Sequence, residues 1–360
     1  MNRWLEIDLG AIKHNIDIIK KEIHWPKVKL MPVVKANAYG HGAISIAKVL
    51  EYEKVDFLAV ATFEEAMELR KNKIKTPILI IGYIDSEDIY EAIKNNITMS
   101  VYDLEMAEKI SKTAKNLGKK ADIHLKLDTG MHRLGFMPDE FIEAYKKLSK
   151  NKNLKIDYLY SHFADINNID FRKKQLDVLD GILKEIEKDK LPKLAVHISR
   201  SEGLDIKETY YNMVRPGLAL YGLSNLEGLK PALTFKTKIA QVKNIKKGEF
   251  VGYSLTYKAK KDMKIATIAV GYSDGYGRNL SNKGEVIVNG KKCSVIGRVC
   301  MNLTIIDVSR VSKIKIGDEV ILIGKGGSQE ISAIDLAKKI NTIPYEIVAR
   351  IPKEIPRIYL

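Results

Sequence analysis

The chain has 360 residues, of which 45% are hydrophobic, and its 60 basic and 45 acidic side chains give a net charge of +15. This length suits two domains, or one barrel of roughly 250 residues with a smaller unit, and the composition is that of a globular protein. The longest apolar run, PILIIGYI, is far shorter than the roughly 18 residues that a membrane-spanning helix needs, which excludes such a span. The basic residues are scattered singly and in pairs, which favours a solvated surface over a nucleic-acid-binding one.

The first residues, MNRWLEIDLG, lack an apolar core followed by a small-residue cleavage site. We therefore expect no signal peptide, a cytoplasmic location and no membrane partner. Cys293 and Cys300 form no Cys-x-x-Cys pair and have no nearby histidine at zinc-site spacing. We expect both thiols to be reduced and the protein to hold no metal.

The chain begins with a strand-like segment, RWLEIDL, and continues into a helix. From Lys29 to Gly222, short β-rich apolar runs alternate with amphipathic segments whose apolar residues recur three and four apart. Eight alternations in about 195 residues predict a (β/α)8 TIM barrel, and the fold class is α/β. The expected strands are 30–36, 55–62, 77–83, 97–102, 121–130, 156–164, 194–199 and 214–222.

After Gly222 the pattern changes to mostly strand. Asn289-Gly290 predicts a hairpin turn, and Ser332 with Asp335 three residues later predicts the start of a helix. We expect a barrel over residues 11–228 and a mainly β domain over 229–360. Residues 1–10 are expected to form a strand that pairs with the C-terminal domain.

The stretch MPVVKANAYGHG (31–42) places Lys35 at the end of an apolar run. Such a lysine either extends to water or is desolvated, and desolvation lowers its pKa until a free amine can react with an aldehyde. In a barrel the active site gathers at the C-terminal ends of the strands. Polar and ionisable residues fall at these predicted ends: Lys35, Asp128, Arg133, His162, Ser199 to Ser201 and Arg215.

Several separated segments resemble motifs of the alanine racemase family, and the resemblance extends from residue 4 to the C-terminus. The segments are KANAYGHG, DTGMHRLGF, YSHFA, RPGLALYG, VGYSLTY, AVGYSDGYG, GRVCMN and TIPYEI. The resemblance implies a fold type III enzyme that uses pyridoxal 5'-phosphate (PLP) and interconverts L- and D-alanine by a two-base mechanism. It further implies that the product supplies D-alanine for peptidoglycan in the cell wall.

The resemblance also implies a role for each matching residue. Lys35 and Tyr253 would be the catalytic bases on opposite faces of the substrate, and Arg215 would face the cofactor's pyridine nitrogen. A guanidinium cannot yield its proton, so this pyridine would stay unprotonated and favour racemisation over transamination. The cofactor-binding residues would be Lys35, Tyr39, His162, Ser201, Arg215, Gly217, Leu218 and Tyr345, and the substrate-binding residues would be Arg133, Met301 and Tyr272. Lys126 matches a lysine that many family members carry in carbamylated form.

The family forms head-to-tail homodimers in which the second tyrosine base comes from the other subunit, so a shared active site is expected here. Three residues depart from the family pattern: His132 replaces a glycine, Arg200 an asparagine and Asn302 an aspartate. These changes leave the substrate preference open, and a racemase for serine, lysine or several amino acids is one alternative. A second alternative is a PLP decarboxylase of similar architecture, and a third is a non-catalytic PLP-binding barrel. The C-terminal β region argues against the third alternative.

Overall fold

The computed structural model describes residues 1–360, and they divide into two compact units. The barrel unit comprises Ile12–Ala36 and Ala43–Lys230. The sheet unit comprises Met1–Ala11, Asn37–Gly42 and Pro231–Leu360. Each unit is therefore built from segments that lie far apart in the sequence.

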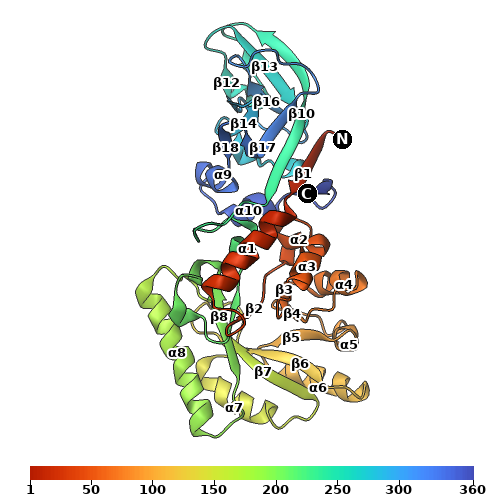
Figure 1. Cartoon of the computed structure of the whole chain (residues 1–360), viewed down its shortest axis with the longest axis vertical. Coiled ribbons are helices and arrows are strands. Elements are labelled where there is room, and N and C mark those ends of the chain that lie inside the picture. The colour runs from red at the N-terminus through yellow and green to blue at the C-terminus, as the bar shows by residue number, and fades with distance from the viewer. The chain divides into compact units, whose positions relative to one another are not determined.

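The barrel unit contains an eight-stranded parallel sheet in the order β2-β9-β8-β7-β6-β5-β4-β3 (Figure 1). Beyond the end of β2, Val34 N donates to Ala59 O at 2.9 Å and Ala59 N donates to Pro32 O at 2.9 Å, so the two ends of the sheet meet and the (β/α)8 barrel is confirmed. The strands are β2 (Lys29–Leu30), β3 (Leu58–Val60), β4 (Ile78–Ile80), β5 (Ile97–Val101), β6 (Ala121–Lys126), β7 (Leu154–Tyr160), β8 (Ala195–Arg200) and β9 (Met213–Arg215).

Amphipathic helices alternate with these strands and bury their apolar residues. Four of the helices begin at a side chain that accepts a backbone N–H: Asp8, Thr62, Asp103 and Asn168. The helices are α1 (Leu9–Glu22), α3 (Ala43–Tyr52), α4 (Phe63–Lys71), α5 (Ile89–Lys94), α6 (Leu104–Asn116), α7 (Pro138–Leu148) and α8 (Ile169–Lys188). No helix is long and apolar enough to cross a membrane.

The sheet unit is mainly β (Figure 1). Its main sheet has the order β15-β14-β17-β10-β1-β19, with β13 and β16 extending from β10, and β18 from β17. The strands are β1 (Arg3–Ile7), β10 (Leu233–Ile245), β13 (Met263–Ile268), β14 (Glu285–Val288), β15 (Lys291–Ser294), β16 (Thr304–Asp307), β17 (Glu319–Gly326), β18 (Gln329–Ile331) and β19 (Arg357–Tyr359). A separate pair is formed by β11 (Phe250–Val251) and β12 (Tyr257–Lys258), and two helices follow: α9 (Ala333–Lys339) and α10 (Pro344–Ala349).

Local signals in this unit act as the sequence predicts. Asn289 and Gly290 have φ values of 47° and 72° and connect β14 to β15. The Ser332 hydroxyl accepts from Asp335 N at 3.0 Å, and the Asp335 carboxylate accepts from Ser332 N at 3.0 Å, which begins α9. The N-terminal β1 pairs with β10 in antiparallel and with β19 in parallel orientation.

Most of the predicted barrel strands are shorter than expected, and proline explains two of the ends. β2 ends at Leu30, before Pro32, and β9 ends at Arg215, before Pro216, because proline has no N–H for a strand ladder. After Pro216 the chain forms a short 3-10 helix, η3 (Leu218–Tyr221). Lys35 opens α2 (Lys35–Tyr39), a turn in which residues 36–39 all have φ between 51° and 54°. This left-handed turn contains no glycine, and each such residue costs about 1–2 kcal/mol.

Candidate active site

Lys35 lies at the C-terminal end of the first barrel strand segment and is half-buried. Burial lowers the pKa of its ammonium group, the Arg133 cation lowers it further, and the Glu65 carboxylate partly offsets both effects. Glu65, on α4, accepts from Ala36 N with one oxygen and from Ala61 N with the other, the latter at 2.8 Å. One carboxylate thus fixes the turn that follows Lys35 to the end of β3.

Arg215 ends β9 and is only 4% exposed. Its guanidinium donates to the carbonyl oxygens of Ser161 at 2.7 Å, His197 at 2.9 Å and Ile198 at 3.2 Å. No carboxylate forms an ion pair with it, and burial lowers its pKa to about 10, so it remains a cation at neutral pH. Arg215 is therefore a buried donor whose charge is not neutralised within the barrel unit.

Arg215 contacts two histidines, His162 and His197, and a third, His124, is hydrogen-bonded to His197. Because arginine only donates, the Nδ1 atoms of His162 and His197 must accept from it. His197 then carries its proton on Nε2 and donates to His124 Nδ1 at 3.0 Å. Burial, followed by the charge of Arg215, lowers the pKa of each histidine, to about 3 for His124, so all three are neutral.

Lys126 ends β6 and is 4% exposed. Its Nζ atom lies 5.4 Å from the centroid of the Tyr160 ring, and the Arg215 guanidinium lies 5.3 Å from the same ring. Burial, with the cations Arg133 and Arg215, lowers the pKa of Lys126 to about 8. At pH 7 the lysine is therefore mostly protonated, and about a tenth of it is the neutral amine, far more than for a lysine of ordinary pKa.

Arg133 lies in the loop that follows β6, and hydrogen bonds within this loop fix its backbone. One oxygen of Asp128 accepts from Gly130 N at 2.8 Å and from His132 N at 3.0 Å. Burial raises the pKa of Asp128, but these hydrogen bonds outweigh the effect and keep it below its ordinary value. Gly135 (φ 144°) packs so closely that an added Cβ would lie 2.4 Å from Asp128 N. Arg133 itself is exposed on this loop.

Ser201 lies just after β8 and is buried. Its hydroxyl oxygen accepts from Gly217 N at 2.8 Å and from Ala219 N at 3.1 Å, which joins the ends of β8 and β9. Leu218 begins η3 between these two donors. These bonds fix the Ser201 hydroxyl beside the first residue of η3. The last two strands of a barrel are where this fold commonly binds phosphate, and the Ser201 O–H with the N–H of Leu218 is a donor pair suited to it.

The sheet unit presents the other predicted residues. Tyr253, Tyr272 and Met301 are 67%, 41% and 57% exposed. Tyr272 N donates to Cys300 O at 3.0 Å, and Ser273 N donates to Met301 O at 3.0 Å. The loop of Tyr253 joins the same surface, because a Cβ added at Gly252 would lie 3.3 Å from Arg298 N. We call this surface, with the exposed Leu255 and Leu303, the tyrosine surface.

Tyr39 and Tyr345 also lie together in the sheet unit, with ring centroids 5.4 Å apart. The segment that carries Tyr39 is held by Arg357, whose Nε donates to Gly40 O at 2.9 Å. Gly40 lies against α10, where an added Cβ would be 2.3 Å from Val348 O. These contacts explain why Asn37–Gly42 belongs to the sheet unit.

The barrel unit thus brings one group of predicted residues to the C-terminal ends of its strands: Lys35, Lys126, Arg133, His162, Ser201, Arg215, Gly217 and Leu218. Sequence reasoning missed Glu65, Tyr160 and His197. Tyr160 and His197 carried a usable signal, because a polar side chain within an apolar strand needs a partner when buried. Glu65 carried none, since glutamate in the first turn of a helix is ordinary.

Comparison with known proteins identifies the family. The N-terminal domain of alanine racemase matches residues 7–225, and its C-terminal domain matches residues 232–359. The chain belongs to the alanine racemase family. An alanine racemase of Methanococcus maripaludis is 41% identical over 368 aligned residues, which cover 99% of this chain and 98% of the relative.

Solved alanine racemases have the same fold. The enzyme of Clostridium difficile 630 superposes with a TM-score of 0.93 at 37% identity, covering 100% of this chain and 96% of that one. The alanine racemase of Bartonella henselae, solved with covalently bound pyridoxal phosphate, has a TM-score of 0.90 at 29% identity, and all of both chains is covered.

Proposed function

We propose that this member of the alanine racemase family interconverts L- and D-alanine with PLP as cofactor, using Lys35 and Tyr253 as the two bases. The observation that carries the proposal is the set of cations at one mouth of the barrel: Lys35, Lys126, Arg133 and Arg215. Arg215 has no carboxylate partner, and burial depresses the pKa of both lysines. Such a mouth suits an anionic cofactor and a carboxylate substrate.

The residues of this chain fit PLP. Ser201 and the backbone N–H groups of Gly217 and Leu218 would hold its phosphate, with Tyr39 and Tyr345 as further phosphate contacts. Arg215, which can only donate, would face the pyridine nitrogen, and His162 beside it would lie against the ring. When bound, PLP delocalises the electrons that remain on the substrate after its Cα proton is removed.

Each base would serve one face of the substrate, because inversion removes a proton from one side of Cα and adds one on the other. The lowered pKa of Lys35 favours the neutral amine that can accept the proton. Tyr253 would supply its hydroxyl from the opposite face. Its position on the exposed tyrosine surface supports a head-to-tail homodimer in which this hydroxyl enters the site of the other subunit.

Arg133 would bind the substrate carboxylate through two parallel N–H donors. Lys126 would support it as a carbamate, formed when the neutral amine adds to CO2 and releases one proton. The pKa of about 8 supports this step because it leaves free amine near neutral pH. The resulting anion would offset the charges of Arg133 and Arg215.

The three residues that depart from the family pattern, Arg200, Asn302 and His132, contact nearby side chains or solvent. Arg200 pairs with Glu202 at 3.4 Å, and the Asn302 side chain donates to Ser273 Oγ at 2.7 Å. His132 is exposed to solvent. None of the three favours a larger substrate, so alanine remains the proposed one, with D-alanine for peptidoglycan as the product and the cytoplasm as the location. In this proposal residues 11–228 bind PLP, and residues 229–360 contribute to the partner's site.

The test is the exchange of the substrate's Cα proton for deuterium. NMR in D2O measures this exchange for L-alanine, D-alanine and a panel of larger amino acids. We expect exchange with inversion for alanine in the wild-type enzyme. Tyr253→Phe should lose inversion while Lys35 still exchanges the proton of one enantiomer. Tyr90→Phe, which changes another exposed tyrosine, on α5 of the barrel unit, is the control. Absence of exchange with every amino acid would reject the proposal.

Subunit mixing tests the shared site. Lys35→Ala and Tyr253→Phe are each expected to be inactive in racemisation, but a mixed dimer would contain one intact site. Half of the dimers are mixed at random, and each has one working site of two, so about a quarter of wild-type activity should return. If both bases came from the same chain, mixing would restore nothing.

A further inference from the structure

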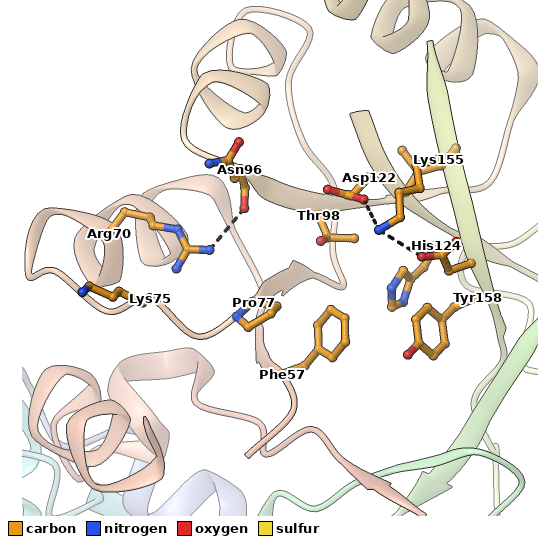
Figure 2. A pocket seen from close by; sticks show the side chains of 12 residues that line it. Phe57, Arg70, Lys75, Pro77, Asn96, Thr98, Asp122, His124, Lys155 and Tyr158 are labelled. Atoms are coloured by element: carbon orange, nitrogen blue, oxygen red, sulfur yellow. Dashed lines mark hydrogen bonds and ion pairs between the residues drawn. The ribbon is translucent and has the colours of Figure 1, made fainter. Parts of the chain in front are cut away.

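A second cavity lies at the opposite mouth of the barrel, at the N-terminal ends of its strands. It has a volume of about 240 Å³, room for roughly eight waters. Phe57, Pro77 and Asn96 immediately precede β3, β4 and β5, and Asp122 lies at the start of β6, whose last residue is Lys126. Figure 2 shows these side chains around the cavity. It is therefore separated from the proposed catalytic site by the length of the strands.

Two buried polar groups of this cavity have no hydrogen-bond partner in the protein. His124, 2% exposed, uses Nδ1 to accept from His197, so its Nε2 carries a proton that no protein atom accepts. Thr98, 6% exposed, lies on the neighbouring strand β5, and its hydroxyl makes no hydrogen bond to the protein. Both atoms reach the space of the cavity, so the hydrogen bonds of these two groups go to water or to a ligand with acceptor atoms there.

The walls beside these groups are aromatic. His124 stacks on Tyr158 with centroids 4.4 Å apart, and the Phe57 ring lies 5.6 Å from His124 and 5.7 Å from Tyr158. The Tyr158 hydroxyl is occupied by Lys29, whose Nζ lies at 2.9 Å. His124 and Lys29, whose Nζ lies 5.6 Å from the Tyr158 ring centroid, cover much of Tyr158, so the half-buried Phe57 offers most of the ring surface.

The charges around His124, at the inner end of the cavity, favour a bound anion. The charges that lower the pKa of His124, after burial itself, are the cations Arg215 and Lys155. Lys75 on the rim has no ion pair with any acidic side chain, and the Arg70 guanidinium is held there by backbone carbonyls. Two acidic residues, Asp122 and Asp157, also line the cavity, and both pair with the single cation Lys155, each at 3.1 Å. With Arg70 and Lys75 the lining residues carry three cations and two carboxylates, a net charge of +1. A negative ligand group at His124 Nε2 therefore meets a positive local field.

We propose that this cavity binds a small planar aromatic carboxylate. Its carboxylate accepts from His124 Nε2–H and from the Thr98 hydroxyl, and its ring lies against Phe57 and Tyr158. The proposal is independent of the catalytic one, since it uses other residues at the other mouth of the barrel.

Benzoate is the probe, titrated into the purified wild-type enzyme and followed by ligand-observed NMR and by calorimetry. We expect saturable binding that excess alanine leaves unchanged, and binding of the neutral isostere benzamide that is about tenfold weaker. Benzoate should also shift the imidazole ¹⁵N and ¹H signals of His124. Absence of saturable binding would mean a cavity that holds only water, and displacement by alanine would place benzoate in the catalytic site; either result overturns the proposal.

Thr98→Val is the decisive variant, because it keeps the side-chain shape and removes a hydroxyl that no protein group uses. It should fold as the wild-type does and bind benzoate about tenfold more weakly. Thr113→Val, on α6 away from the cavity, is the matched control and should bind normally. Equal affinity in the wild-type and Thr98→Val proteins would refute the assigned carboxylate contact.

Discussion

Lys126 is held in a position that destabilises its charged form, so its replacement by methionine should stabilise the protein near neutral pH. Its pKa falls from 10.5 to about 8 through burial and the nearby cations Arg133 and Arg215. That difference corresponds to about 3 kcal/mol. Methionine retains most of the side-chain volume but loses the cation–π contact with Tyr160, which is worth about 0.5–2 kcal/mol. We expect a net gain of about 1–3 kcal/mol in the free energy of unfolding.

The pH dependence has a definite sign. Below pH 8 the lysine is protonated in both states, and the native state bears the full cost of the buried charge. Between about pH 8 and 10.5 the unfolded chain binds the proton and the native protein does not, so wild-type stability rises with pH relative to the variant. The advantage of Lys126→Met should therefore be largest near pH 7 and vanish by about pH 10.5.

Urea unfolding at pH 7, 9 and 10.5 in CO2-free buffer measures this difference, with equal cofactor content in all samples. Lys112→Met, which changes an exposed lysine on α6, is the control and should differ little from wild type. Adding bicarbonate should stabilise the wild-type protein alone and, with ¹³C label, give a carbamate signal that Lys126→Met lacks. A variant less stable than wild type at pH 7 without CO2 would refute the reasoning.

Three further predictions concern other positions. Glu65→Gln should lower stability by about 1.5–3 kcal/mol, because one of two backbone N–H donors loses its acceptor and the other keeps only a neutral one. Loss of the carboxylate should also lower the pKa of Lys35 and shift the acidic limb of its pH–rate profile to lower pH. His197→Phe removes an acceptor from a buried guanidinium and should cost about 1.5–3 kcal/mol in urea unfolding, whereas an unchanged midpoint would contradict the hydrogen-bond chain. Gly40→Ala should destabilise far more than Gly118→Ala: both have positive φ and a strain of about 1–2 kcal/mol, but only at Gly40 would the new Cβ overlap backbone atoms.

Much of the barrel follows from local patterns. A short apolar run buries both faces of a parallel strand, and a 3.6-residue period gives the covering helices, so these elements could be predicted from neighbouring residues alone. The ends of the strands were harder to predict. At Pro32 and Pro216 a missing N–H interrupts the ladder although the apolar run continues, and pairing resumes only in single bonds such as Val33 N to Pro216 O.

The left-handed turn after Lys35 could not be predicted. Residues 36–39 contain no glycine, and of the four only Asn37 is of a type that favours φ near 50°. The neighbouring segment is held by contacts more than 300 positions away, among them Arg357 with Gly40. Similarly, the roles of Glu65 and His197 depend on partners that only the folded chain brings close. The resemblance to the family supplied most site residues, but not the side chains that hold them.

One edge of the main sheet is built from both ends of the chain, because the N-terminal strand β1 lies between β10 and the C-terminal strand β19. During synthesis, β1 leaves the ribosome first but finds its last partner only when the C-terminus is complete. At 5–20 residues per second, this interval is roughly 20–70 s. Until β10 is made, β1 lacks both partners, and until β19 is made one of its edges keeps unpaired backbone groups that other chains can bind. We therefore expect chaperone binding and aggregation of nascent chains to concentrate on the first ten residues, and chains cut before β19 to remain aggregation-prone even when their barrel is complete.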